Sequence, residues 1–116
     1  MMPCKRGDVV LVLFPDSNLR TAKRRPALVV QADKLNTGLP QTIVAMITSN
    51  MARANHASRV ALLLDSPQGR QANVLMDSVI MTDNLATIIA NEIFRVLGSL
   101  KEMGKVEAAL RKTFQL

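Results

Sequence analysis

Tryptophan and tyrosine are absent from the chain, which contains three phenylalanines, one cysteine and one histidine. The scarcity of aromatic residues argues against a single-strand binder that stacks bases on aromatic side chains. The one cysteine, Cys4, cannot form an internal disulfide, and Cys4 with His56 is too small a ligand set for a zinc site. We therefore expect a reduced protein that works without a metal ion or another cofactor.

Long apolar runs are also missing. No segment approaches the roughly 20 apolar residues that span a bilayer. Asp8 and the turn-forming residues 15–18 interrupt the apolar pattern that a secretory signal would need after MMPCKRGD. The chain has no internal repeat, flexible linker or block of like charge. Its 116 residues, 48% of them hydrophobic, predict one soluble domain over residues 1–116, in the cytoplasm and not in a membrane.

Positive charge is in surplus. Fifteen basic residues against nine acidic ones give a formal net charge of +6, which favours polyanionic partners such as nucleic acid or an acidic protein. The densest basic cluster is Lys23, Arg24 and Arg25, directly before Pro26 and an apolar run. Such a cluster is also typical of a solvated group that protects a strand edge, so charge alone does not assign its role.

Six short apolar segments, separated by turn-forming residues, predict strands at residues 8–14, 25–32, 41–49, 59–64, 78–82 and 93–100. Residues 65–73 and the residues that follow 82 are expected to be turns. The first strand is apolar nearly throughout, so we expect both of its faces to be buried. Pro26 lacks a backbone N–H and therefore fits at the start of a strand or on an edge.

A C-terminal helix is predicted by apolar residues at helical spacing, namely Met103, Val106, Leu110 and Phe114. Ser99 and Glu102 form the S-x-x-E pattern, in which the two side chains satisfy unpaired backbone donors at a helix start. Many short strands and one terminal helix indicate a mainly β fold, a strongly bent sheet or small barrel with the helix packed against it.

Five segments, in this order, resemble the PemK/MazF family of bacterial toxins of type II toxin-antitoxin systems. They are KRGDVVLVLFP, RRPALVVQAD, VAMITSN, DSVIMTDNLATI and RVLGSLKEMGKVEAALRKTF. The resemblance implies a small SH3-like β-barrel with a C-terminal helix that forms a homodimer. It also implies a sequence-specific endoribonuclease, an mRNA interferase, that cleaves single-stranded RNA without a metal ion, inhibits growth and is held inactive by a cognate antitoxin. Operator DNA is a further expected partner of the toxin–antitoxin complex.

The resemblance assigns the catalytic roles to two residues. Arg25 stands in the family's R-P-x-L-V motif and Thr48 in its I-T-[SA] motif. RNA supplies its own nucleophile, since the 2′-hydroxyl lies beside the phosphorus and can form a 2′,3′-cyclic phosphate. A guanidinium fixed beside Pro26 would offer a planar fork of donors to the phosphoryl oxygens, and the Thr48 hydroxyl could bond a phosphate oxygen or relay a proton.

Two neighbouring residues are accessory candidates. Ser49 has a hydroxyl like that of Thr48, but strand alternation points it to the opposite side. Asp83 stands where many members of the family have an acid. A two-histidine mechanism is excluded because His56 is the only histidine, so proton transfer is left to Arg25, Thr48, a carboxylate such as Asp83, or water.

Candidates for further RNA contacts are Arg20, Lys23, Arg24 and Asn84. Arg20 lies in a polar connection, residues 16–23, that we expect to form a mobile flap. Lys23 and Arg24 are explained equally well by solubility.

Two positions depart from the family. Met81 and Ala86 replace residues that are basic in other members, which would change substrate contacts and specificity on that side.

Two other functions are compatible with the same sequence. One is a non-catalytic toxin of this fold that poisons a protein target such as DNA gyrase, a reading that rests on fold analogy alone. The other is a basic barrel that binds DNA at its own operator, for which salt-sensitive duplex binding without strand scission would be the signature.

Overall fold

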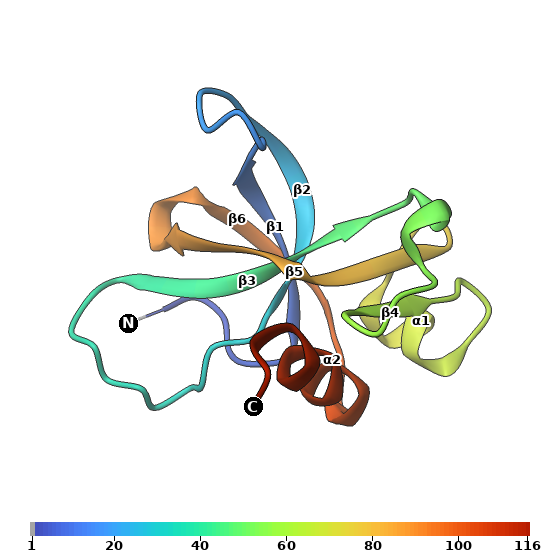
Figure 1. Cartoon of the computed structure of the whole chain (residues 1–116). Helices are drawn as coiled ribbons and strands as arrows, with labels where there is room; N and C mark the ends of the chain where they lie inside the picture. The colour runs from blue at the N-terminus through green and yellow to red at the C-terminus, as the bar shows by residue number, and fades with distance from the viewer. Residues whose placement is uncertain (1) are drawn as a thin grey trace.

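The computed structural model describes residues 2–116, which form an antiparallel sheet of six strands with one longer and one shorter α-helix (Figure 1). The strands are β1 (Asp8–Pro15), β2 (Ala22–Val29), β3 (Gln41–Thr48), β4 (Arg59–Leu62), β5 (Ser78–Ile89) and β6 (Ile93–Ser99). The helices are α1 (Pro67–Ala72) and α2 (Gly104–Phe114), and two 3₁₀ turns are η1 (Met51–Arg53) and η2 (Ala90–Glu92). The predicted mainly β class with a C-terminal helix is confirmed.

The sheet has the strand order β4-β5-β3-β2-β1-β6, and each neighbouring pair is antiparallel. It twists strongly but is not closed, since no pairing joins β4 to β6 within residues 2–116. The helix α2 packs against β4 and β5, and α1 packs against β6. None of the helices formed by the described residues has both the length and the apolar composition needed to cross a bilayer.

The first strand is fully buried on one face, whereas its other face is buried at Val9 and half-buried at Leu11 and Leu13, so the prediction of two buried faces holds in part. Val9 of β1 and Leu28 of β2 belong to an apolar cluster that includes buried residues of α1 and α2. Val10, Val12 and Phe14 point the other way, into a second cluster between the strands. Alternation along β1 therefore supplies both halves of the core.

The second strand begins three residues earlier than predicted, so Lys23, Arg24 and Arg25 are part of β2. Pro26 lies within the strand. It is tolerated because β2 pairs with β1 along its length but with β3 only at 27–29, which leaves the first half of β2 as an edge on the β3 side. Thus β2 and β3 separate before Ala27, while β3 continues along β5 as far as Thr48.

The prediction that the fifth strand ends at Asp83 is wrong, because β5 continues to Ile89. Opposite β3, Met46 pairs with Met81 whereas Ala45 pairs with Leu85. Residues 82–84 are therefore extra residues on β5 and form a bulge, after which the ladder resumes. The polar residues that look like a turn in the sequence mark this bulge.

The prediction of a turn over residues 65–73 is also wrong, since residues 67–72 form α1. Ser66 caps this short helix by accepting a hydrogen bond from the Gly69 backbone N–H (3.0 Å), Pro67 occupies its first turn, and Asn73 ends it in the left-handed conformation (φ 58°). These residues are typical of a helix start and a helix end.

The predicted capping box of the last helix does not form. Ser99 is the last residue of β6, and the Leu100 N–H donates to the Gly7 carbonyl (2.8 Å), so this segment belongs to the sheet. The helix begins at Gly104 without a side-chain cap. Met103 and Val106 are buried as predicted, but Phe114, at the far end, is 54% exposed.

The backbones of β6 and α1 approach closely at Gly98, so a substitution at this position tests how tightly the two elements pack. A Cβ added at Gly98 would lie 2.6 Å from the Ala72 carbonyl carbon and closer still to the Gln71 carbonyl oxygen. We expect Gly98→Ala to lower the free energy of unfolding by about 1–3 kcal/mol, because backbone must move to admit the methyl group. Urea unfolding measures this change. Gly104→Ala is the control, since nothing lies within 4 Å of its added Cβ, and it should unfold at equal or higher urea concentration. Equal stability of the Gly98→Ala variant and the wild type would contradict the close packing.

Candidate active-site groove

An open groove of about 720 Å³ lies where β2 separates from β3. Its walls come from the β1–β2 turn, the edge of β2, the end of β3, η1 and the β5 bulge. The lining residues are Pro15, Asp16, Ser17, Asn18, Thr21, Ala22, Lys23, Arg25, Met46, Thr48, Asn50, Arg53 and Asn84. Arg25 and Thr48, predicted as a catalytic pair, thus line the same groove from two different strands.

The side chain of Arg25 is held by a neighbouring acid. Its Nη2 donates to Asp16 Oδ1 at 3.3 Å, and the side chain remains 33% exposed. Thr48 is the last residue of β3 and is half-buried, and its Oγ1 accepts a hydrogen bond from the Asn50 N–H (3.2 Å). Both groups therefore have a fixed position and a free surface toward the groove.

The connection between β1 and β2 is a tight turn of residues 16–21, shorter than the flap expected over residues 16–23. The Asp16 N–H donates to the Thr21 carbonyl (2.9 Å), and Leu19 adopts the left-handed conformation (φ 60°). The side chain of Asn18 accepts hydrogen bonds from the N–H groups of Arg20 (2.9 Å) and Thr21 (3.2 Å). This turn folds Asp16 back over Arg25.

Asp16 is kept ionised by its surroundings. The hydrogen bond from the Thr21 hydroxyl (2.6 Å) is the main cause that lowers the pKa of Asp16, and it outweighs the opposing effect of desolvation. The hydrogen bond from Arg25 and the charge of Lys23 lower it further. An ionised Asp16 holds the guanidinium of Arg25 in one orientation at neutral pH.

The predicted RNA-binding residues do not all lie on one face. Lys23 lines the groove with Arg25, two residues along the same edge. Arg24 points to the other face of β2, where its guanidinium lies over the Phe94 ring, 4.1 Å from the centroid. Arg20 is exposed in the turn, outside the groove lining. Asn84 lines the groove, and its amide nitrogen lies 3.5 Å from the sulfur of Met46.

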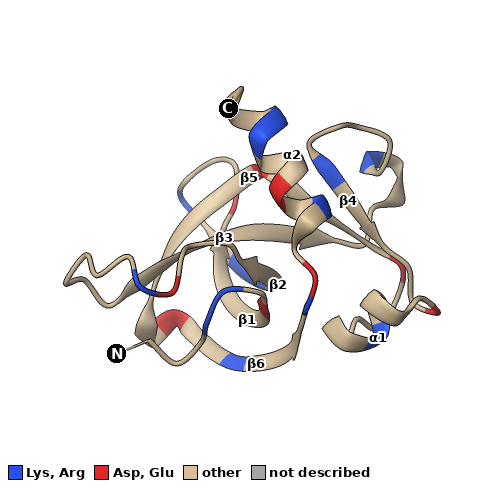
Figure 2. Ribbon diagram, turned by 90° about the horizontal axis from the view of Figure 1, so that it is seen from below, with Lys and Arg blue, Asp and Glu red and all other residues tan. Residues whose placement is uncertain are grey.

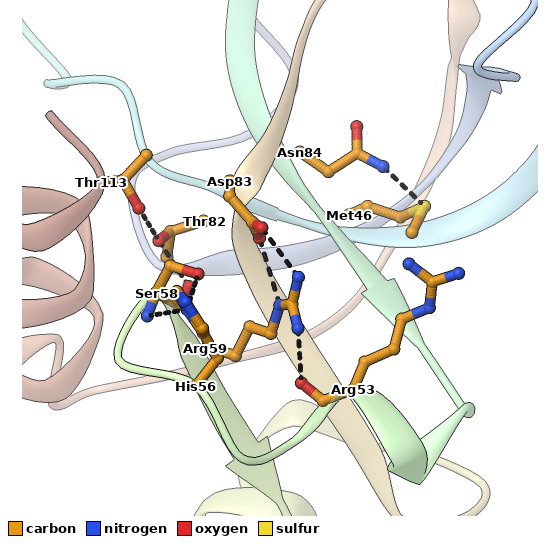
Figure 3. A network of polar contacts seen from close by, with 9 residues as sticks. All are labelled: Met46, Arg53, His56, Ser58, Arg59, Thr82, Asp83, Asn84 and Thr113. Carbon is orange, nitrogen blue, oxygen red and sulfur yellow. Dashed lines mark hydrogen bonds and ion pairs between the residues drawn. The ribbon is translucent and has the colours of Figure 1, made fainter.

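The accessory candidates are placed outside the groove lining. Ser49 is exposed just beyond the end of β3. The carboxylate of Asp83 is bound by Arg59, whose Nη2 and Nε donate at 2.9 and 3.4 Å (Figure 3). Among the described residues, no three His, Cys, Asp or Glu side chains gather into a group that could hold a metal ion.

The two positions at which the chain departs from the family pattern also lie away from the groove lining. Met81 is buried in the sheet (3% exposed), and Ala86 packs against the second apolar cluster. His56 lies in the loop before β4, where its Nδ1 is 2.7 Å from the Ser58 hydroxyl.

Asp83 gives the structure a pH-dependent contact. Partial burial raises the pKa of Asp83, but hydrogen bonds from Arg59 and from its own backbone, with the charge of Arg59, lower it by more. Because the folded pKa lies below the unfolded value, the pair with Arg59 stabilises the fold above about pH 4 and loses this effect as the pH falls through the folded pKa. The pair is partly exposed, so we expect less than about 1 kcal/mol. The Tm of the wild type should exceed that of Asp83→Asn at pH 6, and the difference should vanish in acid. A difference of constant size from pH 6 to pH 2 would contradict this assignment.

Asp16, Asn50 and Arg53 are polar groove residues to which the sequence assigned no role of their own. Asp16 approaches Arg25 only because the turn is tight, and Asn50 and Arg53 reach the groove because η1 folds back after β3. Asn50 caps η1 by accepting a hydrogen bond from the Ala52 N–H (3.2 Å). Its position after a strand is a recognisable cap signal, whereas nothing in the sequence distinguishes Arg53 from other surface cations.

Positive charge is not confined to the groove. Figure 2 shows basic residues on β2, β4, β6, α1 and α2, with acidic residues between them. Within the groove, the basic residues are Lys23, Arg25 and Arg53, and Asp16 is the only carboxylate among the lining residues.

Comparison with known proteins identifies relatives of the whole domain. The model of a family described as "PemK-like, MazF-like toxin of type II toxin-antitoxin system" matches residues 5–114. Endoribonuclease MazF6 of Mycobacterium tuberculosis and endoribonuclease MazF2 of Mycobacterium bovis are each 35% identical over 105 residues, which cover 90% of this chain and 90% of theirs.

Solved structures share the fold. An endoribonuclease in complex with its cognate antitoxin, from Mycobacterial species, superposes with a TM-score of 0.73 at 21% identity, covering 97% of this chain and 96% of that chain. A MazE-MazF structure (Form-III) from Deinococcus radiodurans superposes with a TM-score of 0.71 at 16% identity, covering 97% of both chains.

Proposed function

Because the chain belongs to the family of PemK-like, MazF-like toxins of type II toxin-antitoxin systems, we propose that it is an endoribonuclease toxin that cleaves single-stranded RNA in the groove between β2 and β3. The observation that carries this proposal is the position of Arg25 and Thr48, which line one open groove from two strands. A guanidinium and a hydroxyl can both donate hydrogen bonds to the phosphoryl oxygens, where negative charge develops during displacement.

The reaction is an attack of the RNA on itself. The 2′-oxygen forms a bond to phosphorus, the bond from phosphorus to the 5′-oxygen breaks, and the 2′ proton passes to a base while the leaving oxygen gains a proton. The products are a 2′,3′-cyclic phosphate and a 5′-hydroxyl. No metal is required for this chemistry, because the nucleophile belongs to the substrate and charge on the phosphoryl oxygens can be met by fixed hydrogen-bond donors.

Arg25 is the principal donor in this scheme. Among the described residues only its Nη2 is engaged, by Asp16, which leaves the other N–H groups of the guanidinium for phosphoryl oxygens. Asp16 holds the side chain before substrate arrives, so little ordering is needed at the moment of reaction. Thr48 completes the site by donating its hydroxyl proton to a phosphoryl oxygen while its oxygen accepts from Asn50.

The partners follow from the family. We propose that the protein acts in the cytoplasm as a homodimer and is neutralised by a cognate antitoxin. An endoribonuclease in complex with its cognate antitoxin and a MazE-MazF structure, both similar to this chain, support the antitoxin. The net charge of +6 suits an acidic antitoxin segment. Co-expression with the adjacent reading frame should restore growth and yield a co-purifying complex, and binding of that complex to operator DNA can be measured on the same sample.

Incubation of purified protein with single-stranded RNA in EDTA tests the proposed activity. We expect cleavage at a restricted set of sequences. Intact RNA, together with undiminished toxicity of an Arg25→Ala variant in cells, would overturn the proposal in favour of a toxin that acts on a protein target. Salt-sensitive binding of duplex DNA without scission of either nucleic acid would instead favour a DNA-binding role.

A further inference from the structure

Arg53 is a second guanidinium that lines the groove, and its charge is not offset. It ends η1, five residues after Thr48. Within residues 2–116 the ion pairs are made by Arg6, Arg25 and Arg59, and the side chain of Arg53 makes no hydrogen bond. Figure 3 shows this side chain extending toward Met46 and Asn84, which also line the groove. An arginine without an ion-pair partner among the described residues thus lines the same groove as the Arg25–Asp16 pair.

The backbone of Arg53 is held by a hydrogen bond from the side chain of Arg59. Arg59 of β4 donates from Nη1 to the Arg53 carbonyl oxygen (3.2 Å) and, with its other nitrogens, binds the Asp83 carboxylate (2.9 and 3.4 Å). Asp83 lies in the β5 bulge next to Asn84. One arginine therefore joins the end of η1 to the bulge, so both walls that carry Arg53 and Asn84 are held together (Figure 3).

The bulge is itself anchored to the core. Thr82 is fully buried, and its hydroxyl donates to the Ser58 carbonyl (2.6 Å) and lies 2.8 Å from the Thr113 hydroxyl of α2. The Thr82 N–H also donates to the Ser58 carbonyl (3.0 Å). These contacts give Asp83 a rigid base, which is the condition for a positioning residue.

The chemistry of the groove indicates what Arg53 binds. None of the lining residues is aromatic, so the walls offer no aromatic ring on which bases could stack, and basic and polar side chains are left to bind the phosphates and base edges of RNA. The guanidinium of Arg25 is partly neutralised by Asp16, whereas that of Arg53 is not. A single strand whose scissile phosphate lies at Arg25 and Thr48 carries a neighbouring phosphate on each side, and Arg53 lines the same groove.

We propose that Arg53 binds a phosphodiester next to the scissile one, and that the Arg59–Asp83 pair positions Arg53 for this contact. The proposal rests on RNA cleavage in the groove. In this proposal Asp83 positions Arg53 through Arg59 and does not transfer a proton in the reaction. Arg53 contributes to binding of the strand and not to the chemical step.

Binding of an uncleavable strand measures the contact without catalysis. The probe is a single-stranded DNA copy of a cleaved RNA sequence, labelled for fluorescence anisotropy. We expect Arg53→Ala to weaken binding about tenfold, and the slope of log K against log salt concentration to fall by about 0.7, the value for one phosphate contact on a single strand. Arg53→Lys keeps the charge and should keep the slope. Arg111→Ala, which removes an exposed arginine from α2 outside the groove lining, is the matched control and should bind like the wild type.

Kinetics on the RNA itself separate this role from catalysis. We expect Arg53→Ala to raise KM about tenfold with kcat within about threefold of the wild type. An unchanged Kd and salt slope, or a loss of kcat as large as the loss of kcat/KM, would overturn the proposal. If the wild type binds single strands in an Arg53-dependent manner but leaves every RNA intact, the proposed activity fails, and only the binding of a phosphodiester by Arg53 stands. If the wild type cleaves RNA and Arg53→Ala is indistinguishable from it, only the role of Arg53 fails.

Asp83→Asn tests the positioning half of the proposal with opposed expectations. Removing an acid makes the protein more positive, so general electrostatics predicts tighter binding of the strand. Loss of the Arg59–Asp83 pair, which positions Arg53, predicts weaker binding of the strand. We expect this second result, with an affinity about threefold lower than that of the wild type. Adding Arg53→Ala to the Asp83→Asn variant should then reduce the affinity for the strand by a smaller factor than Arg53→Ala does in the wild type. Tighter binding by Asp83→Asn, or additive losses in the double variant, would overturn the positioning role.

Discussion

Replacing Arg25 by alanine is expected to lower the rate of RNA cleavage by two to three orders of magnitude. A preorganised donor aimed at charge that develops in a transition state contributes about 3–4 kcal/mol, and Arg25 is the guanidinium that Asp16 holds in the groove. The ground-state affinity for RNA should change much less, because Lys23 and Arg53 remain in the groove lining. The measurement is the single-turnover rate of cleavage in EDTA at saturating protein.

Two further variants show that the loss belongs to the chemistry. Arg25→Lys keeps the charge without the planar fork of donors, so it should recover only part of the rate. Arg95→Ala removes an exposed arginine of β6, outside the groove lining, and should cleave at the wild-type rate. A rate for Arg25→Ala within threefold of the wild type would remove Arg25 from the mechanism.

Thr48→Val is expected to lower the cleavage rate about a hundredfold while leaving RNA binding near the wild-type value. Valine keeps the shape and the strand preference of threonine, so the variant removes the hydroxyl and little else. The Asn50 N–H loses its partner at an exposed position, where water replaces it. The rate should fall because a donor to the phosphoryl oxygen is lost.

Thr48→Ser is the matched control, since it restores the hydroxyl on a smaller side chain. Serine should return the rate to within about tenfold of the wild type. If threonine served only as a strand former, valine would be as active as the wild type and serine would be the poorer replacement. That order of activities, with urea unfolding unchanged in all three proteins, would contradict a role for Thr48 in catalysis.

The sheet was largely predictable because short runs rich in β-branched residues and bounded by turn-forming residues, such as residues 8–14, favour strands. The errors came where tertiary contacts override a local signal. Ser99 and Glu102 carry a helix-start pattern, but Ser99 is held in β6. Asp83 and Asn84 read as a turn, yet β5 resumes its pairing with β3 after the bulge. The short helix α1 was missed although Ser66 and Asn73 bound it.

The candidate site was predictable only where a motif carried it. Arg25 and Thr48 stand in short motifs, and the structure places both in the groove. Asp16 and Arg53 stand in none of the quoted motifs, and they line the groove where β2 and β3 diverge and where Arg59 ties η1 to β5. Alternation along β2 turns Arg24 toward Phe94 and turns Lys23 and Arg25 to the opposite face. The sequence did not predict this alternation, because the predicted strand began at Arg25, three residues after the observed start at Ala22.

The most direct measurement is cleavage of one RNA in two forms, once its sequence has been found by mapping the 5′ ends of cellular transcripts after induction. One form is all ribose, and the other carries a single 2′-deoxyribose on the 5′ side of the scissile phosphate. We predict that the purified protein in EDTA cleaves the first, leaving a 2′,3′-cyclic phosphate and a 5′-hydroxyl, and binds the second without cleaving it. Cleavage of the deoxy form at the same bond, or products that end in a 5′-phosphate, would contradict attack by the 2′-hydroxyl in the groove of Arg25 and Thr48.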